Sequence, residues 1–188
     1  MNLKEFNNLT DLFFFKSSKQ NSTTIFLEWL NPSNRKKFTW GEVESNIYKL
    51  AKVLKDNIAI GDRCLLVSEN RPEWLITDLA IMLANGITVP AYTTYTEKDY
   101  KYLIEDCKPS IIIASNDEMH DKLKNIIKEK DFIKKVIAFD KLKNIEQKDK
   151  YLAFDSIVEN KLNENDKIKN KNLNRNSAAC IIYTSGTA

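Results

Sequence analysis

Short apolar runs alternate with longer segments in which apolar residues recur every three or four positions. The runs have the length and composition of buried strands, and they cover residues 64–67, 87–89, 110–114 and 135–138. Strands that are separated by single helices and joined by short loops predict an α/β fold, a mainly parallel sheet with helices on both faces. Such a sheet binds ligands at the carboxyl ends of its strands.

The segments between these runs predict helices. Residues 74–84 are apolar on nearly every side, so this helix is expected to be buried, with Asn70 as its N-cap and Pro72 in its first turn. The spacing over 100–107 predicts an amphipathic helix, and the apolar positions over 119–127 predict a third one.

The residues before this core predict a β-hairpin that leads into a helix. Two β-prone runs flank turn-forming residues, which together predict a hairpin over 23–39. Thr39 followed by Glu42 matches a capping box and predicts a helix start at that point. The three phenylalanines at 13–15 are expected to form a buried N-terminal anchor, a use we prefer to contact with a membrane surface.

Residues 141–177 differ from the core because they are rich in Lys and Asn and weakly periodic. One short helix is expected over 151–158, and the remainder is expected to be an exposed connection. A basic binding patch is the alternative, but interspersed Asp and Glu neutralise the lysines. The predicted organisation is an N-terminal segment and hairpin, an α/β core, this connection, and a strand with the start of a loop, at residues 1–36, 37–140, 141–177 and 178–188.

Composition narrows the class of protein. The 188 residues fit one domain, or one domain and part of another, and 43% of them are hydrophobic. The 29 basic and 26 acidic residues give a formal net charge of +3, without the concentrated basic face expected of a nucleic-acid partner. No secretory signal is visible, and the longest apolar stretches are too short to span a bilayer. Cys64, Cys107 and Cys180 each have apolar neighbours, so we expect reduced core cysteines in an intracellular protein.

The chemistry of the chain is concentrated after residue 177. A buried-strand pattern over 178–183 leads directly into Thr184, Ser185, Gly186 and Thr187. Small hydroxyl residues around a glycine can turn successive backbone N–H groups toward one point, and such a nest binds phosphate. An ordinary turn after a strand is the alternative.

Counting glycines excludes two common nucleotide-binding loops. The chain has only Gly41, Gly61, Gly86 and Gly186. Their spacing permits neither the G-x-G-x-x-G pattern of dinucleotide folds nor the G-x-x-x-x-G-K-[ST] pattern of P-loop enzymes. Phosphate binding in this chain therefore requires a different loop.

Two other groups of polar residues are candidate sites. His120 stands near three acidic residues, where a metal site is the alternative to a solvated helix face, and we favour the solvated face. Asn70, Arg71 and Glu73 follow a strand, but capping and first-turn charge account for Asn70 and Glu73. No catalytic or metal-ligating residue is assigned in this chain.

The segment Ile182-Tyr183-Thr184-Ser185-Gly186-Thr187 resembles the signature loop of the AMP-forming acyl-activating enzymes, which include acyl-CoA synthetases, luciferases and adenylation domains. Ala188 stands where a second Thr is usual in that loop. Further similarities occur in order along the chain, at residues 38–43, 61–66, 69–74 and 85–92. The last two look most like the long-chain fatty acyl-CoA synthetases.

This resemblance implies that the chain is the N-terminal part of the large AMP-binding domain of an adenylate-forming enzyme. A fatty acid would react with Mg²⁺-bound ATP to give an acyl-adenylate and pyrophosphate. The thiol of coenzyme A would then displace AMP. Thr184, Ser185, Gly186 and Thr187 would bind the ATP phosphates, whereas the loop lysine, the magnesium ligand and the C-terminal domain would lie downstream. The resemblance implies an enzyme of lipid metabolism that is located in the cytoplasm. Peripheral association with the inner face of the membrane is compatible with this location.

Two alternatives remain open. One is a related enzyme that adenylates a different carboxylic acid or uses an acceptor other than coenzyme A. The other is a non-catalytic binding module, if the natural protein has no further sequence.

Overall fold

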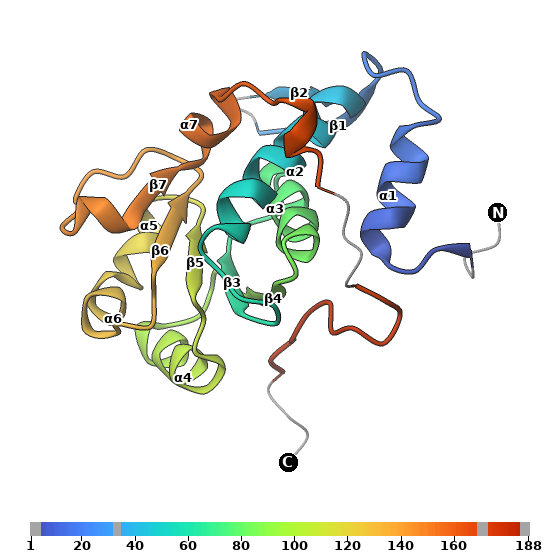
Figure 1. Cartoon of the computed structure of the whole chain (residues 1–188). Helices are drawn as coiled ribbons and strands as arrows, with labels where there is room; N and C mark the ends of the chain where they lie inside the picture. The colour runs from blue at the N-terminus through green and yellow to red at the C-terminus, as the bar shows by residue number, and fades with distance from the viewer. Residues whose placement is uncertain (1–4, 32–34, 169–172, 185–188) are drawn as a thin grey trace.

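The computed structural model describes residues 5–31, 35–168 and 173–184. Within them, five strands form one sheet in the order β4-β3-β5-β6-β7, and every neighbouring pair is parallel (Figure 1). The strands are β3 (Arg63–Val67), β4 (Ile87–Ala91), β5 (Ile111–Ala114), β6 (Lys135–Ala138) and β7 (Tyr151–Ala153). The four strands predicted from apolar runs are therefore confirmed.

Helices cover both faces of this sheet. On one face lie α2 (Trp40–Lys55), α3 (Pro72–Leu83) and α7 (Phe154–Glu159), and on the other lie α4 (Glu97–Cys107), α5 (Asp117–Asp121) and α6 (Lys124–Glu129). Successive residues of β3 alternate between them: Leu66 packs with the first group and Leu65 with the second. The predicted α/β class and its two helical layers are confirmed.

The N-terminal part packs against the first helical layer. Helix α1 (Leu9–Ser17) is followed by the antiparallel strands β1 (Ile25–Trp29) and β2 (Lys36–Thr39), which confirm the hairpin; its turn at 32–34 lies outside the described residues. Thr39 and Glu42 form the predicted capping box of α2. Phe14 stacks on Tyr48 with ring centroids 4.7 Å apart, and Phe13 also packs on the core. The anchor prediction thus holds for Phe13 and Phe14, whereas Phe15 is exposed.

Two helix predictions need correction. Helix α3 starts at Pro72 as its first residue, but Arg71 is the N-cap residue and no side chain caps the helix, so the Asn70 assignment is wrong. The predicted third helix is divided into α5 and α6, because the Leu123 N–H donates to the His120 carbonyl oxygen three residues back. That tighter bond ends α5 without Gly or Pro, so no helix-breaking residue marks the end of α5 in the sequence.

The Lys/Asn-rich segment contains a strand that periodicity did not reveal. Residues 151–153 form β7 and pair in parallel with β6, and only the part from Phe154 onward is helical. The expected single helix over 151–158 is therefore wrong in its first three residues, which are too few to show a period. Two short 3₁₀ turns, Lys148–Lys150 and Glu164–Asp166, are the other regular elements described in this segment.

Candidate functional site

Residues 178–184, which we call the lead-in segment, run beside β4 at the outer edge of the sheet. The Ile181 N–H donates to the Thr88 carbonyl oxygen at 2.9 Å, and the Thr88 N–H donates to the Ala179 carbonyl oxygen at 3.2 Å. These bonds make a single parallel bridge between Thr88 and Cys180. The expected buried strand is wrong for this chain, because among the described residues the lead-in segment has a sheet neighbour on one side only. Cys180 is accordingly exposed and is not a core residue.

The side chain of Tyr183 provides a second attachment for the lead-in segment. Its hydroxyl donates a hydrogen bond to Asp106 Oδ2, near the end of α4, and its ring packs against the apolar cluster beneath that helix. Burial, with the hydrogen bond to Asp106, raises the pKa of Tyr183 well above its usual value. The hydroxyl therefore stays protonated and acts as a donor.

Thr184 directly follows this attachment and is exposed. It is the first of the four residues predicted to bind phosphate. Ser185, Gly186 and Thr187 lie outside the described residues, so the phosphate site stays a prediction for all four. The described residues show how the chain is held just before the predicted phosphate site.

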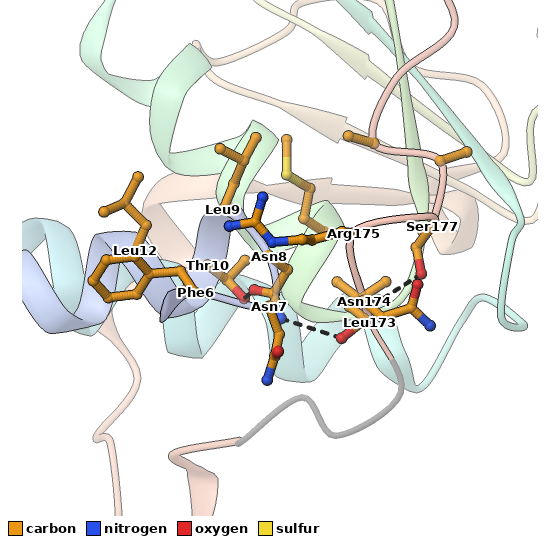
Figure 2. Close-up of a pocket in the computed structure, with 14 residues that line it drawn as sticks. Phe6, Asn7, Asn8, Leu9, Thr10, Leu12, Leu173, Asn174, Arg175 and Ser177 are labelled. Atoms are coloured by element: carbon orange, nitrogen blue, oxygen red, sulfur yellow. Dashed lines mark hydrogen bonds between the residues drawn. The ribbon is translucent and has the colours of Figure 1, made fainter. Parts of the chain in front are cut away.

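A cavity of 330 Å³ lies between the start of α1 and residues 173–179, which precede the bridge to β4 (Figure 2). Asn8 spans its rim, because it caps α1 and its Nδ2 donates to the Leu173 carbonyl oxygen at 3.3 Å. Thr10 donates to Asn8 Oδ1 at 2.7 Å, and Ser177 accepts from the Asn174 N–H at 3.1 Å. These polar groups bond to the protein itself, so the cavity marks a contact between the start of α1 and residues 173–179.

The carboxyl edge of the sheet, where such folds bind ligands, holds an ion-pair network instead. Arg71 is 6% exposed, and its guanidinium makes two hydrogen bonds to Glu73, at 2.9 and 3.0 Å, and two to Asp140, at 3.2 and 3.0 Å. The Trp29 ring lies 4.6 Å from the guanidinium carbon and the Phe139 ring 5.4 Å from it. The hairpin, the loop after β3 and the end of β6 therefore meet at Arg71.

The environment of this network keeps both Arg71 and Glu73 ionised. Burial alone would raise the pKa of Glu73, but the hydrogen bonds from Arg71 outweigh it and hold that pKa below its usual value. Burial disfavours the Arg71 cation, yet the bonds to Glu73 and Asp140 raise the pKa of Arg71 further. Both groups stay ionised, which suits a buried cross-link and not acid–base catalysis. First-turn charge alone was too weak an explanation for Glu73, because its carboxylate is paired with Arg71, two residues away, and lies 3.6 Å from the ammonium group of Lys36 on β2.

His120 is buried and does not lie on a solvated face, contrary to expectation. It is 2% exposed, and its Nε2 lies 2.8 Å from the Tyr151 hydroxyl on β7. Burial lowers the pKa of His120, so the neutral ring is favoured. In the described part of the chain no group of three or more His, Cys, Asp or Glu side chains is arranged to hold a metal ion.

Over the same residues, no helix has both the length and the apolar character needed to cross a bilayer.

Comparison with known proteins places these features in context. A family model described as AMP-binding enzyme matches residues 14–188. Long chain acyl-CoA synthetase 3 of Arabidopsis thaliana is 24% identical over 156 residues, which cover 79% of this chain and 23% of that protein. A mitochondrial acyl-coenzyme A synthetase of Rattus norvegicus is 32% identical over 91 residues, which cover 47% of this chain and 16% of that protein. The chain thus spans less than a quarter of the length of these relatives.

Solved structures show the same fold. An anthranilate CoA ligase in complex with anthranoyl-AMP superposes with a TM-score of 0.81 at 17% identity, over 100% of this chain and 35% of that one. A coronafacic acid ligase variant of Pectobacterium brasiliense gives 0.78 at 21% identity, over 95% of this chain and 33% of that one. At these identities the likeness concerns the fold alone.

Proposed function

The chain belongs to the AMP-binding enzyme family, and we propose that it forms part of an adenylate-forming ligase that joins a long-chain fatty acid to coenzyme A. The observation that carries this proposal is the family match over residues 14–188, which takes in the hydroxyl-rich loop from Thr184 to Thr187. The lead-in segment supports it, because hydrogen bonds to β4 and α4 hold the chain just before that loop.

The proposed reaction has two steps. A carboxylate oxygen of the acid attacks the α-phosphorus of ATP, the bond from that phosphorus to the bridging oxygen breaks, and pyrophosphate leaves. The sulfur of coenzyme A then attacks the acyl carbon, AMP leaves, and the thiol proton passes to the solvent. Negative charge grows on the departing pyrophosphate in the first step, and the N–H and hydroxyl groups of Thr184, Ser185, Gly186 and Thr187 would stabilise it.

Magnesium enters this proposal with the nucleotide. The described residues offer no cluster of carboxylates or imidazoles for a metal ion. Phosphate oxygens are ligands that Mg²⁺ prefers, so the ion would arrive bound to ATP and neutralise part of the phosphate charge. The contribution of this chain would be to orient the β- and γ-phosphates.

The identity of the acid is the finer part of the proposal. Residues 69–74 and 85–92 look most like the long-chain branch, and long-chain acyl-CoA synthetases are among the relatives. A different acid is the second candidate, because the matching solved structures include ligases for anthranilate and coronafacic acid. We place the enzyme in the cytoplasm with peripheral access to the membrane, where long-chain acids partition.

A substrate panel tests this choice on the complete protein, expressed from the reading frame that contains these residues. The panel comprises palmitate, octanoate, anthranilate and malonate, each with ATP, Mg²⁺ and coenzyme A. We expect AMP release and a palmitoyl thioester, detected by mass spectrometry, with the highest kcat/KM for palmitate. A preference for anthranilate or malonate would replace the long-chain assignment with the second candidate.

A further inference from the structure

We propose that Asp106 is a positioning residue for the phosphate-binding loop and that it acts through Tyr183. This inference rests on the proposed function, because it concerns how the same loop is held. Asp106 lies near the carboxyl end of α4 and accepts the hydrogen bond from the Tyr183 hydroxyl. Tyr183 is adjacent in the chain to Thr184, the first residue of the predicted loop.

Two attachments of different kinds precede the loop. The Ile181 N–H is bonded to the Thr88 carbonyl oxygen at 2.9 Å, and two residues later the Tyr183 side chain is bonded to Asp106. The residue between them, Ile182, is 63% exposed and contributes no comparable contact. The first attachment fixes the chain against β4 and the second fixes it against α4, so the direction in which the chain enters the loop is set by both.

The bond to Asp106 is of a strong type. A hydrogen bond from an O–H group to a carboxylate is shorter and stronger than a hydrogen bond between neutral groups. The Tyr183 ring is also packed against the apolar cluster beneath α4, so its hydroxyl is presented to Asp106 with little freedom. An anchor of this kind lowers the entropy that the following residues lose when phosphate binds.

Helix α4 does not need this bond for its own stability. Tyr100, Leu103, Ile104 and Cys107 are buried in the core, and Thr96 closes a capping box at the start of the helix. Loss of Asp106 should therefore leave α4 in place and release only the lead-in segment. A positioning role and a structural role consequently predict different measurements.

The first arm of the test uses the 188-residue chain and needs no activity. In Asp106→Ala and Tyr183→Phe, amide hydrogen exchange at Ile181, whose N–H is bonded to the Thr88 carbonyl oxygen, should be about threefold to tenfold faster, the range expected for one hydrogen bond. Exchange at Leu103 should stay unchanged. The matched control is Glu105→Gln, which removes the neighbouring carboxylate of α4, bonded to Lys130, and should leave exchange in the lead-in segment unaltered. Unchanged exchange in the first two variants overturns the proposal.

The second arm uses the complete protein and compares KM with kcat. Asp106→Ala and Tyr183→Phe should each raise KM for ATP by about threefold to tenfold while KM for the acid stays constant. Asp106→Asn, which keeps a hydrogen-bond acceptor, should raise KM for ATP less than Asp106→Ala does. The double variant Asp106→Ala/Tyr183→Phe should have a KM for ATP no higher than that of either single variant. An equal effect on both KM values, or additive effects in the double variant, overturns the positioning role.

The two arms separate failure of this inference from failure of the proposed function. If the complete protein consumes no ATP with any acid, the proposed function fails, and hydrogen exchange still decides whether Asp106 anchors the lead-in segment. If ATP is consumed and exchange is unchanged in the variants, the proposed function stands and the role of Asp106 is rejected.

Discussion

Arg71 Nη2 lies 3.0 Å from Asp140 Oδ1, although 69 positions separate the two residues in the chain. This ion pair joins the loop after β3 to the end of β6, and Trp29 of the hairpin faces the same guanidinium. Glu73 is bonded to Arg71 as well and is buried. The carboxyl edge of the sheet is thus held by one arginine with partners from three segments.

Replacing this arginine should destabilise the fold strongly. In Arg71→Ala the Glu73 carboxylate loses both bonds to the guanidinium, and the cation that stays near it among the described residues is Lys36, at 3.6 Å. Removing one partner of a buried ion pair costs about 3–5 kcal/mol, so we expect a loss of that order in the free energy of unfolding, measured by urea denaturation of the chain. Arg35→Ala, which removes an exposed pair with Glu28, is the matched control. A loss in the Arg71 variant no greater than in the control would contradict this role.

The sole histidine gives the chain a pH dependence of known sign. Burial lowers the pKa of His120 in the folded state below its ordinary value of 6.5, so the unfolded chain binds this proton more readily. The stability contribution is complete above pH 6.5 and is lost as the pH falls through that value toward the folded-state pKa. Urea denaturation between pH 7.5 and 5.5 should show falling stability in the natural chain and a flatter profile in His120→Gln. Identical profiles would refute a buried neutral His120.

The three cysteines should react at very different rates. Burial raises the pKa of Cys64 to about 12 and that of Cys107 to about 11, whereas Cys180 is exposed. Because the thiolate is the reactive form, a disulfide reagent at pH 8 should modify Cys180 first in the folded chain and all three after unfolding. In Cys180→Ser the rapid phase should disappear. Rapid modification of Cys64 would show that the sheet is not packed as described.

The sequence was informative wherever the deciding interactions were local. The runs at 64–67 and 111–114 are continuous and apolar because parallel strands are buried on both faces, and the structure places strands there. The capping box of Thr39 and Glu42 depends on residues three positions apart, so it was visible as well. The alternation of these runs with helical segments was enough to predict the fold class.

The errors arose where distant partners decide the outcome. Arg71 bonds to Asp140 and His120 approaches Tyr151, and no local pattern marks either pairing. The exposure of Cys180 follows from the position of its segment at the sheet edge, which periodicity does not encode. For the candidate site, the loop residues were visible as a motif, whereas its attachment through Asp106 required the three-dimensional arrangement.

The 188-residue chain by itself should show no ligase activity. In the proposed enzyme the acid-binding pocket and the residues that complete the nucleotide site would come from further sequence, since this chain spans less than a quarter of the Arabidopsis and rat relatives. We expect no acyl-CoA in a mass-spectrometric assay and only weak ATP binding by calorimetry. Acyl-CoA formation by this polypeptide alone would contradict the proposal that further sequence is needed to complete the active site.

Pyrophosphate exchange into ATP by the complete protein is the most direct measurement of the central claim, because it reports acyl-adenylate formation without coenzyme A. With Mg²⁺ present, labelled pyrophosphate should enter ATP only when palmitate or another accepted acid is added. A Gly186→Val variant should lower the rate by about 10²- to 10³-fold, as expected when donors to a developing negative charge are displaced. Exchange that is independent of any acid, or no exchange with any acid of the panel, would contradict the proposal that this chain belongs to an acid-activating ligase.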